Sequence, residues 1–168
     1  TQLVLSAGQR IRPVDLGAIA ASGHCEVVVA QKPLVAIIPT GTELVPVGQA
    51  VKPGDIIEFN SMVLAGQVQE WGGIAKRYPI LADDFDLIVK TTAEAAEEAD
   101  LILINAGSSA GAEDFTSRVV EKLGELLVHG VAIRPGHPVV LGMVQNNSGL
   151  NVPCIGVPGY PVSAALTG

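Results

Sequence analysis

One segment of the sequence combines residue types that bind anions. It reads "NAGSSAGAEDF", spans residues 105 to 115 and follows the apolar run "LILI". Gly107 and Gly111 permit backbone conformations in which several N–H groups point outward together. Ser108 and Ser109 add hydroxyl donors beside them. These features predict a loop that holds a phosphate.

The residues after the two serines extend this hypothesis to a metal ion. A helix is expected to begin at or near Asp114, so its free N–H groups would face the same phosphate. Glu113 and Asp114 supply carboxylate oxygens, which magnesium prefers as ligands. A second interpretation stays open, since glycine- and serine-rich turns are common connectors and Asp114 could simply cap the helix. The segment is neither a Walker A loop nor a GxGxxG motif.

Such a loop needs strands and helices to position it, and the chain alternates between them. The continuous apolar run at 34–41 predicts a strand buried on both faces of a parallel sheet, and 99–105 predicts a further buried strand. The segment 74–81 is expected to form the strand between them. Shorter strands are expected at the following segments: 26–30, 125–133, 137–144 and 151–159. The alternation predicts an α/β domain with a mostly parallel sheet and helices on both faces.

Helix signals fill the gaps between these strands. The first helix is expected after Pro13, with Gly23 as its stop. Asn60 or Ser61 would cap a second helix that carries Trp71 as a core residue. Asp83-Asp84 would open a third helix, whose Glu94, Glu97 and Glu98 face water, and a fourth would run from Asp114 to Gly124. The segment 51–61 is expected to be a loop.

Four strands should end in loops along one edge of the sheet, where ligands of such folds bind. The loops read "PTGTEL", "NAGSSAGAEDF", "RPGHP" and "GVPGYPVSA". Several of their side chains have two interpretations. Glu43 could bind a metal or be a solvated acid, and Asp83 and Asp84 fit helix caps better than ligands. Arg134 could pair with a phosphate or form a surface salt bridge. His137 could bind an anion or be a hydrogen-bonded structural residue. Tyr160 could stack on a flat ring or pack within its turn.

The bulk composition narrows the classes of function. The 168 residues are 48% hydrophobic and 16% charged, enough apolar material for one compact domain with a small appendage. The net charge of −7 argues against wholesale binding to nucleic acid or to an anionic membrane. Cys25 and Cys154 predict buried thiols of a reducing compartment, with a disulfide left open. No membrane-spanning run or signal peptide is recognisable, so we expect a cytoplasmic protein.

The chain divides into two parts. Residues 1–31 are interpreted as a lead-in segment, a helix and a short strand, belonging to a preceding domain. Residues 32–168 form the main domain. Because the sequence starts at Thr1 and stops within a helix that Pro161 begins, we expect the domain to be excised from a longer chain.

The order of these segments resembles a known family. The segments "PTGTEL", "NSMVLAGQVQEWGG", "ADD", "ADLILINAGSSAGAEDF", "VAIRPGHP" and "GVPGYPVSA" resemble the molybdopterin-binding (MoaB/Mog) domain of molybdenum cofactor biosynthesis. The lead-in "LSAGQRIRPVDLGAIAASG" narrows the resemblance to the molybdopterin molybdotransferase (MoeA) type. The resemblance covers nearly the whole chain in order and spacing.

This resemblance implies a three-layer α/β/α, Rossmann-like fold and a defined chemistry. Family members bind molybdopterin or adenylylated molybdopterin, and the glycine-rich loop receives its phosphate-bearing end. Acidic residues position magnesium and molybdate, while adenylylated molybdopterin is hydrolysed and molybdate is delivered to the dithiolene. The expected partner is thus a small pterin phosphate or nucleotide. Relatives form trimers as stand-alone domains and dimers in the multidomain transferase, so a homo-oligomer is implied.

The resemblance also assigns residues. Asp114, Glu43 and Asp84 take the catalytic positions, with Asp114 and Glu43 at the metal. The implied ligand-binding residues are Gly41, Thr42, Gly107, Ser108, Ser109, Gly111, Arg134, Gly136, His137, Pro158, Gly159, Tyr160 and Ser163.

The chain departs from the family pattern at charged positions. The family usually has an aspartate at Thr42, lysines at Gly130 and His137, and an asparagine at Tyr160. These changes remove charges on which phosphate and magnesium binding depend. They favour an alternative function, a non-catalytic pterin- or oxyanion-binding module that serves a longer multidomain protein. A nucleotide-processing relative on the same fold is a third hypothesis.

Overall fold

The computed structural model describes residues 3–106 and 112–167, with side chains in the fourth helix described from residue 115 onward. The chain divides into two compact units, Thr1–Gln31 and Lys32–Gly168. Each unit is described by itself. Within this described part, no helix is both long enough and apolar enough to cross a membrane.

The first unit contains helix α1, Pro13–Ala21. Its start is fixed by a reciprocal pair, since the Arg12 backbone N–H donates to Asp15 Oδ2 at 2.8 Å and the Arg12 guanidinium also donates to that carboxylate. This ion pair lowers the pKa of Asp15, chiefly through the hydrogen bonds from Arg12. The predicted helix is confirmed. The strand predicted at 26–30 is wrong, because Val27 to Val29 are exposed and pair with no other strand in the described residues.

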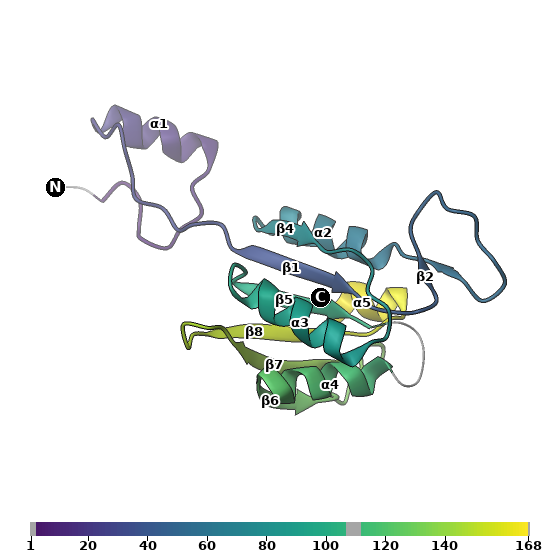
Figure 1. The fold of residues 1–168 in the computed structure, drawn as a ribbon. Coiled ribbons are helices and arrows are strands. Elements are labelled where there is room, and N and C mark those ends of the chain that lie inside the picture. The colour runs from purple at the N-terminus through teal and green to yellow at the C-terminus, as the bar shows by residue number, and fades with distance from the viewer. Residues whose placement is uncertain (1–2, 107–111, 168) are drawn as a thin grey trace. The chain divides into compact units, whose positions relative to one another are not determined.

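The second unit is built on a six-stranded sheet in the order β4-β1-β5-β8-β7-β6 (Figure 1). The strands are β1 Leu34–Pro39, β4 Ile74–Arg77, β5 Leu101–Asn105, β6 Gly124–His129, β7 Val140–Gln145 and β8 Asn151–Val157. The pairs β4–β1, β1–β5 and β5–β8 are parallel, and β7 runs antiparallel to both of its neighbours. The mostly parallel sheet is therefore confirmed.

Helices cover both faces of this sheet and form the predicted three layers (Figure 1). They are α2 Asn60–Glu70, α3 Phe85–Ala96, α4 Ala112–Leu123 and α5 Pro161–Thr167. Alternate residues of β1 point to opposite sides. Val35 and Ile37 pack with α2 and α5, while Ala36 and Ile38 pack with α3 and α4. Both faces of the strand are buried, which is why its sequence is a continuous apolar run.

A second, two-stranded parallel sheet was not predicted. It pairs β2, Leu44–Val45, with β3, Ile56–Ile57, and β3 lies inside the segment 51–61 that was expected to be a loop. Backbone N–H groups of Ile56 and Glu58 donate to the carbonyls of Glu43 and Val45 at 2.8 and 2.9 Å. We call residues 44–57 the arm. Two residues per strand are too few to leave a periodic pattern in the sequence.

The boundaries of the helices show what local signals can and cannot predict. Asp84 is the N-cap of α3 and accepts from the Leu87 N–H at 3.0 Å, as expected. At α2, however, the N-cap is Phe59, not Asn60 or Ser61.

The burial of two residue types differs from expectation. Trp71 was expected in the core but is 65% exposed. Cys154 is buried as expected, but Cys25 is exposed, and both thiols are free.

Candidate functional site

The carboxyl ends of the central strands meet at one edge of the sheet. Pro39 lies beside Asn105, and Asn105 lies beside Val157. The Thr40 N–H donates to the Asn105 carbonyl at 2.8 Å, and the Ala106 N–H donates to the Val157 carbonyl at 3.1 Å. The segment between β6 and β7 reaches the same edge, because β7 begins opposite the end of β8. The described parts of the four predicted loops are therefore brought together.

Asn105 organises this edge and was not singled out from the sequence. Its side chain is buried, and its amide donates to the carbonyls of Val157 and Pro158 at 3.3 and 3.2 Å. Asn60 donates in the same way to the Gly159 carbonyl at 2.8 Å. A buried amide such as that of Asn105 requires such partners, and the partly buried Asn60 adds a second contact to the turn after β8. The available signal was a polar residue that ends the apolar run "LILIN".

The turn after β1 is tied to the start of α3. The Thr42 N–H donates to Asp83 Oδ2 at 3.2 Å, and the Asp83 N–H donates to Thr42 Oγ1 at 3.1 Å. Asp83 Oδ1 is buried and accepts no hydrogen bond within the described residues. Glu43 is half-buried in the same turn, and Gly41 is buried beside its carboxylate. Thr42 thus positions the carboxylate of Asp83 and is adjacent in sequence to Glu43.

The segment between β6 and β7 carries Arg134 and His137, whose side chains are exposed. His137 Nδ1 lies 2.6 Å from the Val131 carbonyl. Because a carbonyl can only accept, Nδ1 carries the hydrogen and Nε2 is left for a second partner. Gly136 is buried at φ +108, and a Cβ there would lie 2.5 Å from Thr167 Cγ2 in α5. The loop is therefore anchored at Gly136, while the side chains of Arg134 and His137 face solvent.

A cavity of about 310 Å³ opens at this edge. Asn105 and Ala106 line it from β5, Gly159 and Tyr160 from the turn after β8, and Ile56 to Asn60 from the arm and α2. Pro158 is buried behind the turn, and Ser163 in α5 accepts through its carbonyl from Thr167. The predicted residues Gly159 and Tyr160 thus line the same cavity as Asn105 and Ala106.

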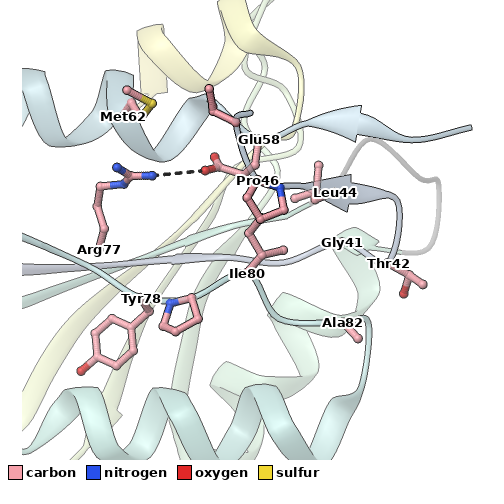
Figure 2. Close-up of a pocket in the computed structure, with 12 residues that line it drawn as sticks. Gly41, Thr42, Leu44, Pro46, Glu58, Met62, Arg77, Tyr78, Ile80 and Ala82 are labelled. Carbon is pink, nitrogen blue, oxygen red and sulfur yellow. Dashed lines mark ion pairs between the residues drawn. The ribbon is translucent and has the colours of Figure 1, made fainter. Parts of the chain in front are cut away.

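A larger cavity of about 680 Å³ adjoins the first, and Leu44 and Glu58 line both. Glu58 is 5% exposed, and its two oxygens accept from the Ser61 N–H and hydroxyl at 2.7 and 2.6 Å. Arg77 donates to Ser61 Oγ at 2.8 Å and pairs with Glu58 at 3.7 Å (Figure 2). Neither Glu58 nor Arg77 was singled out from the sequence, because their meeting depends on the arm.

Several predicted residues lie outside the described part of the chain. They are Gly107, Ser108, Ser109 and Gly111, together with the side chain of Asp114. Asp84 lies within it and serves as the helix cap. Among the described residues, no three His, Cys, Asp or Glu side chains gather as a metal site. Magnesium commonly uses one or two carboxylates plus substrate phosphate, so a site that includes Glu43 would not require a cluster of three such side chains.

Comparison with known proteins identifies the family. Residues 36–167 match the family described as "Probable molybdopterin binding domain". The chain belongs to this family. A molybdopterin molybdenumtransferase of Haemophilus influenzae is 32% identical over 98% of the chain, and one of Bacillus subtilis is 34% identical over 80% of it. The chain is therefore a domain of molybdenum cofactor biosynthesis homologous to MoeA.

Solved structures agree on the fold. A molybdopterin biosynthesis MoeA protein of Pyrococcus horikoshii superposes with a TM-score of 0.82 at 35% identity, covering 97% of this chain and 39% of that one. A tungsten cofactor synthesizing MoaB protein of Pyrococcus furiosus shares the fold at 14% identity, with a TM-score of 0.60 over 81% of this chain and 88% of that one. The chain spans 40% and 31% of the two transferases named above.

Proposed function

We propose that this domain binds molybdopterin or adenylylated molybdopterin at the carboxyl edge of its sheet and takes part in inserting molybdate. The observation that carries the proposal is the convergence of the strand ends around the smaller cavity, with Asn105 and Asn60 fixing one wall. Folds of this kind bind ligands beyond the carboxyl ends of the strands, where the N–H groups of loops and helix starts can meet a phosphate. Family membership supports a pterin as that ligand.

The family resemblance supports a role for each of several side chains. The glycine-rich segment with Ser108 and Ser109 would hold the terminal phosphate. Arg134 and His137 would approach its charge from the neighbouring loop. Glu43 and Asp114 would hold magnesium, which stabilises the negative charge that develops when a phosphoanhydride bond breaks. Molybdate is the second substrate in this proposal. We expect a cytoplasmic homo-oligomer, a dimer or a trimer, as in the family.

A calorimetric titration tests the binding. Adenylylated molybdopterin is titrated into the wild-type chain and into Asp114→Ala, with and without magnesium. We expect binding that strengthens with magnesium in the wild type and loses that dependence in the variant. Equal affinity in all four titrations would exclude the magnesium role, and no binding in any of them would exclude the function.

A second candidate, a binding module without turnover, is favoured by one specific observation. Thr42 occupies the position of a family aspartate and is hydrogen-bonded to Asp83 in a closed pair. Release of AMP from adenylylated molybdopterin in the presence of molybdate separates the candidates. Binding without AMP release supports the module, whereas multiple turnovers support the transferase.

A further inference from the structure

The larger cavity contains a hydrogen-bonding pair that the proposed phosphate site does not use. Its walls are formed by the arm, the first turn of α2 and the segment after β4. Its volume of about 680 Å³ falls within the range of small-molecule sites. Met62, Pro46 and Ile80 line this cavity together with Glu58 and Arg77 (Figure 2). The cavity thus combines apolar walls with one carboxylate and one guanidinium.

Glu58 and Arg77 keep hydrogen-bonding groups that their mutual ion pair does not use and that a ligand could contact. Ser61 donates one hydrogen bond to each Glu58 oxygen, and a carboxylate offers about four acceptor positions. The Arg77–Glu58 separation of 3.7 Å is an ion pair rather than a short hydrogen bond. Arg77 Nε is committed to Ser61, which fixes the guanidinium plane and leaves further N–H groups available for a ligand. The pair therefore offers acceptors on one side and donors on the other.

We propose that the larger cavity binds the pterin ring of the substrate through its 2-amino-4-oxopyrimidine edge. That edge presents two adjacent N–H donors and then a carbonyl acceptor. Glu58 accepts from the 2-amino group and the ring N3–H, while Arg77 donates to the 4-oxo group. Met62, Pro46 and Ile80 contact the flat faces. Because Glu58 is 5% exposed, its hydrogen bonds form away from bulk water and favour this edge strongly.

Because the larger and the smaller cavity adjoin, a single ligand could occupy both. Leu44 and Glu58 line both, so the ring in the larger cavity would lie next to the smaller one. A pterin whose side chain ends in phosphate would then place the phosphate toward Asn105 and Ala106, which line the smaller cavity. This inference rests on the proposed function, since it assigns the other end of the same substrate.

Three small probes without phosphate test the ring site in the intact chain. Pterin carries the full edge, lumazine replaces the 2-amino donor with an oxygen acceptor, and adenosine presents one donor at its amino group. Binding is followed by fluorescence or by calorimetry. We expect pterin to bind and lumazine to bind at least about tenfold more weakly, as for loss of a hydrogen bond to a charged group. Undetectable pterin binding, equal binding of lumazine or preference for adenosine would overturn the proposal.

Matched variants locate the site. Glu58→Gln keeps the shape but removes the charge, and we expect pterin affinity to fall at least about tenfold. Met62→Trp places a large ring into the cavity from an exposed position on α2, and should also reduce pterin binding. Val63→Trp is the control, since Val63 is exposed on the same helix and lines neither of the two cavities. Unchanged pterin binding by Met62→Trp, in a folded variant, would contradict the site even if Glu58→Gln fails to fold.

Failure of this inference is separable from failure of the proposed function. Adenylylated molybdopterin is titrated into the wild type, Glu58→Gln and Met62→Trp. Tight binding that is unaffected by either variant would keep the proposed function and exclude the ring site. No binding of adenylylated molybdopterin to the wild type would exclude the proposed function itself. Binding of adenylylated molybdopterin that weakens in Glu58→Gln and Met62→Trp but not in Val63→Trp supports both the proposed function and the ring site.

Discussion

At the scale of single residues, the loop that carries Arg134 and His137 depends on Gly136. The backbone there has φ +108, and an added Cβ would lie 2.5 Å from Thr167 Cγ2 and 3.1 Å from Ile133 Cδ1. We therefore expect Gly136→Ala to lower the free energy of unfolding by about 1–3 kcal/mol, through backbone strain and overpacking together. Thermal or denaturant unfolding measures the change.

Gly149→Ala is the matched control for this substitution. Gly149 also has a positive φ, +81, but a Cβ there would meet nothing within 4 Å. It should show the backbone penalty alone and therefore a smaller loss of stability. Equal losses in the two variants would contradict the account that Gly136 anchors its loop against α5.

The two thiols should differ sharply in reactivity. Burial raises the pKa of Cys154 to about 12, whereas Cys25 is exposed. Thiolate is the reactive form, and at pH 8 only about one Cys154 in ten thousand would be ionised. With Ellman's reagent we expect one rapid equivalent and a second only after denaturation. Cys25→Ser should abolish the rapid phase, and two rapid equivalents in the wild type would contradict the burial of Cys154.

Residue patterns predicted the positions that follow strands but not the partners of those residues. Gly41, Gly159 and Tyr160 were predicted from glycine-rich turns after apolar runs, and the structure places them at the expected edge. Glu58 and Arg77 were missed because they are separated in sequence by α2 and meet only when the arm and β4 are folded. Long-range ion pairs of this kind leave no local sequence signal.

At the scale of elements, the contribution of the α3 N-cap, Asp84, to the free energy of unfolding can be measured. Its side chain accepts from the Leu87 N–H at 3.0 Å, and Asp86 lies in the first turn of the same helix. We expect Asp84→Ala to cost about 0.5–2 kcal/mol of stability, because the Leu87 N–H loses its partner. Denaturant unfolding measures the loss. Asp86→Ala removes a first-turn charge without removing the cap, so it should cost less, and the reverse order would contradict the cap.

Elements were predictable from sequence where a periodic run was long and buried. The runs of β1 and β5 and the amphipathic pattern of α3 gave correct strands and a correct helix. The segment 26–30 is rich in valine, yet it has no strand partner in the described residues, so β propensity alone was insufficient. The short strand β3 depends instead on pairing with β2 across the arm.

At the scale of the whole molecule, the buried cores lie entirely within the second unit. Both clusters of buried residues are formed by side chains between Val35 and Ala164. We therefore expect residues 32–168 to fold without residues 1–31. Circular dichroism and thermal unfolding of this fragment should match the longer chain within a few degrees, about the shift that a 1 kcal/mol change causes in a domain of this size. An unfolded fragment would contradict the division into two units.

The central claim is that the ligand binds at the carboxyl edge of the sheet, and hydrogen exchange tests this location most directly. Exchange is followed by mass spectrometry with adenylylated molybdopterin and magnesium present or absent. The account predicts slower exchange in peptides that cover 39–45, 104–118, 131–140 and 156–163. Peptides at the opposite edge, such as 145–151, should not change. Protection confined to that opposite edge, or bound ligand without protection at the carboxyl edge, would contradict the account.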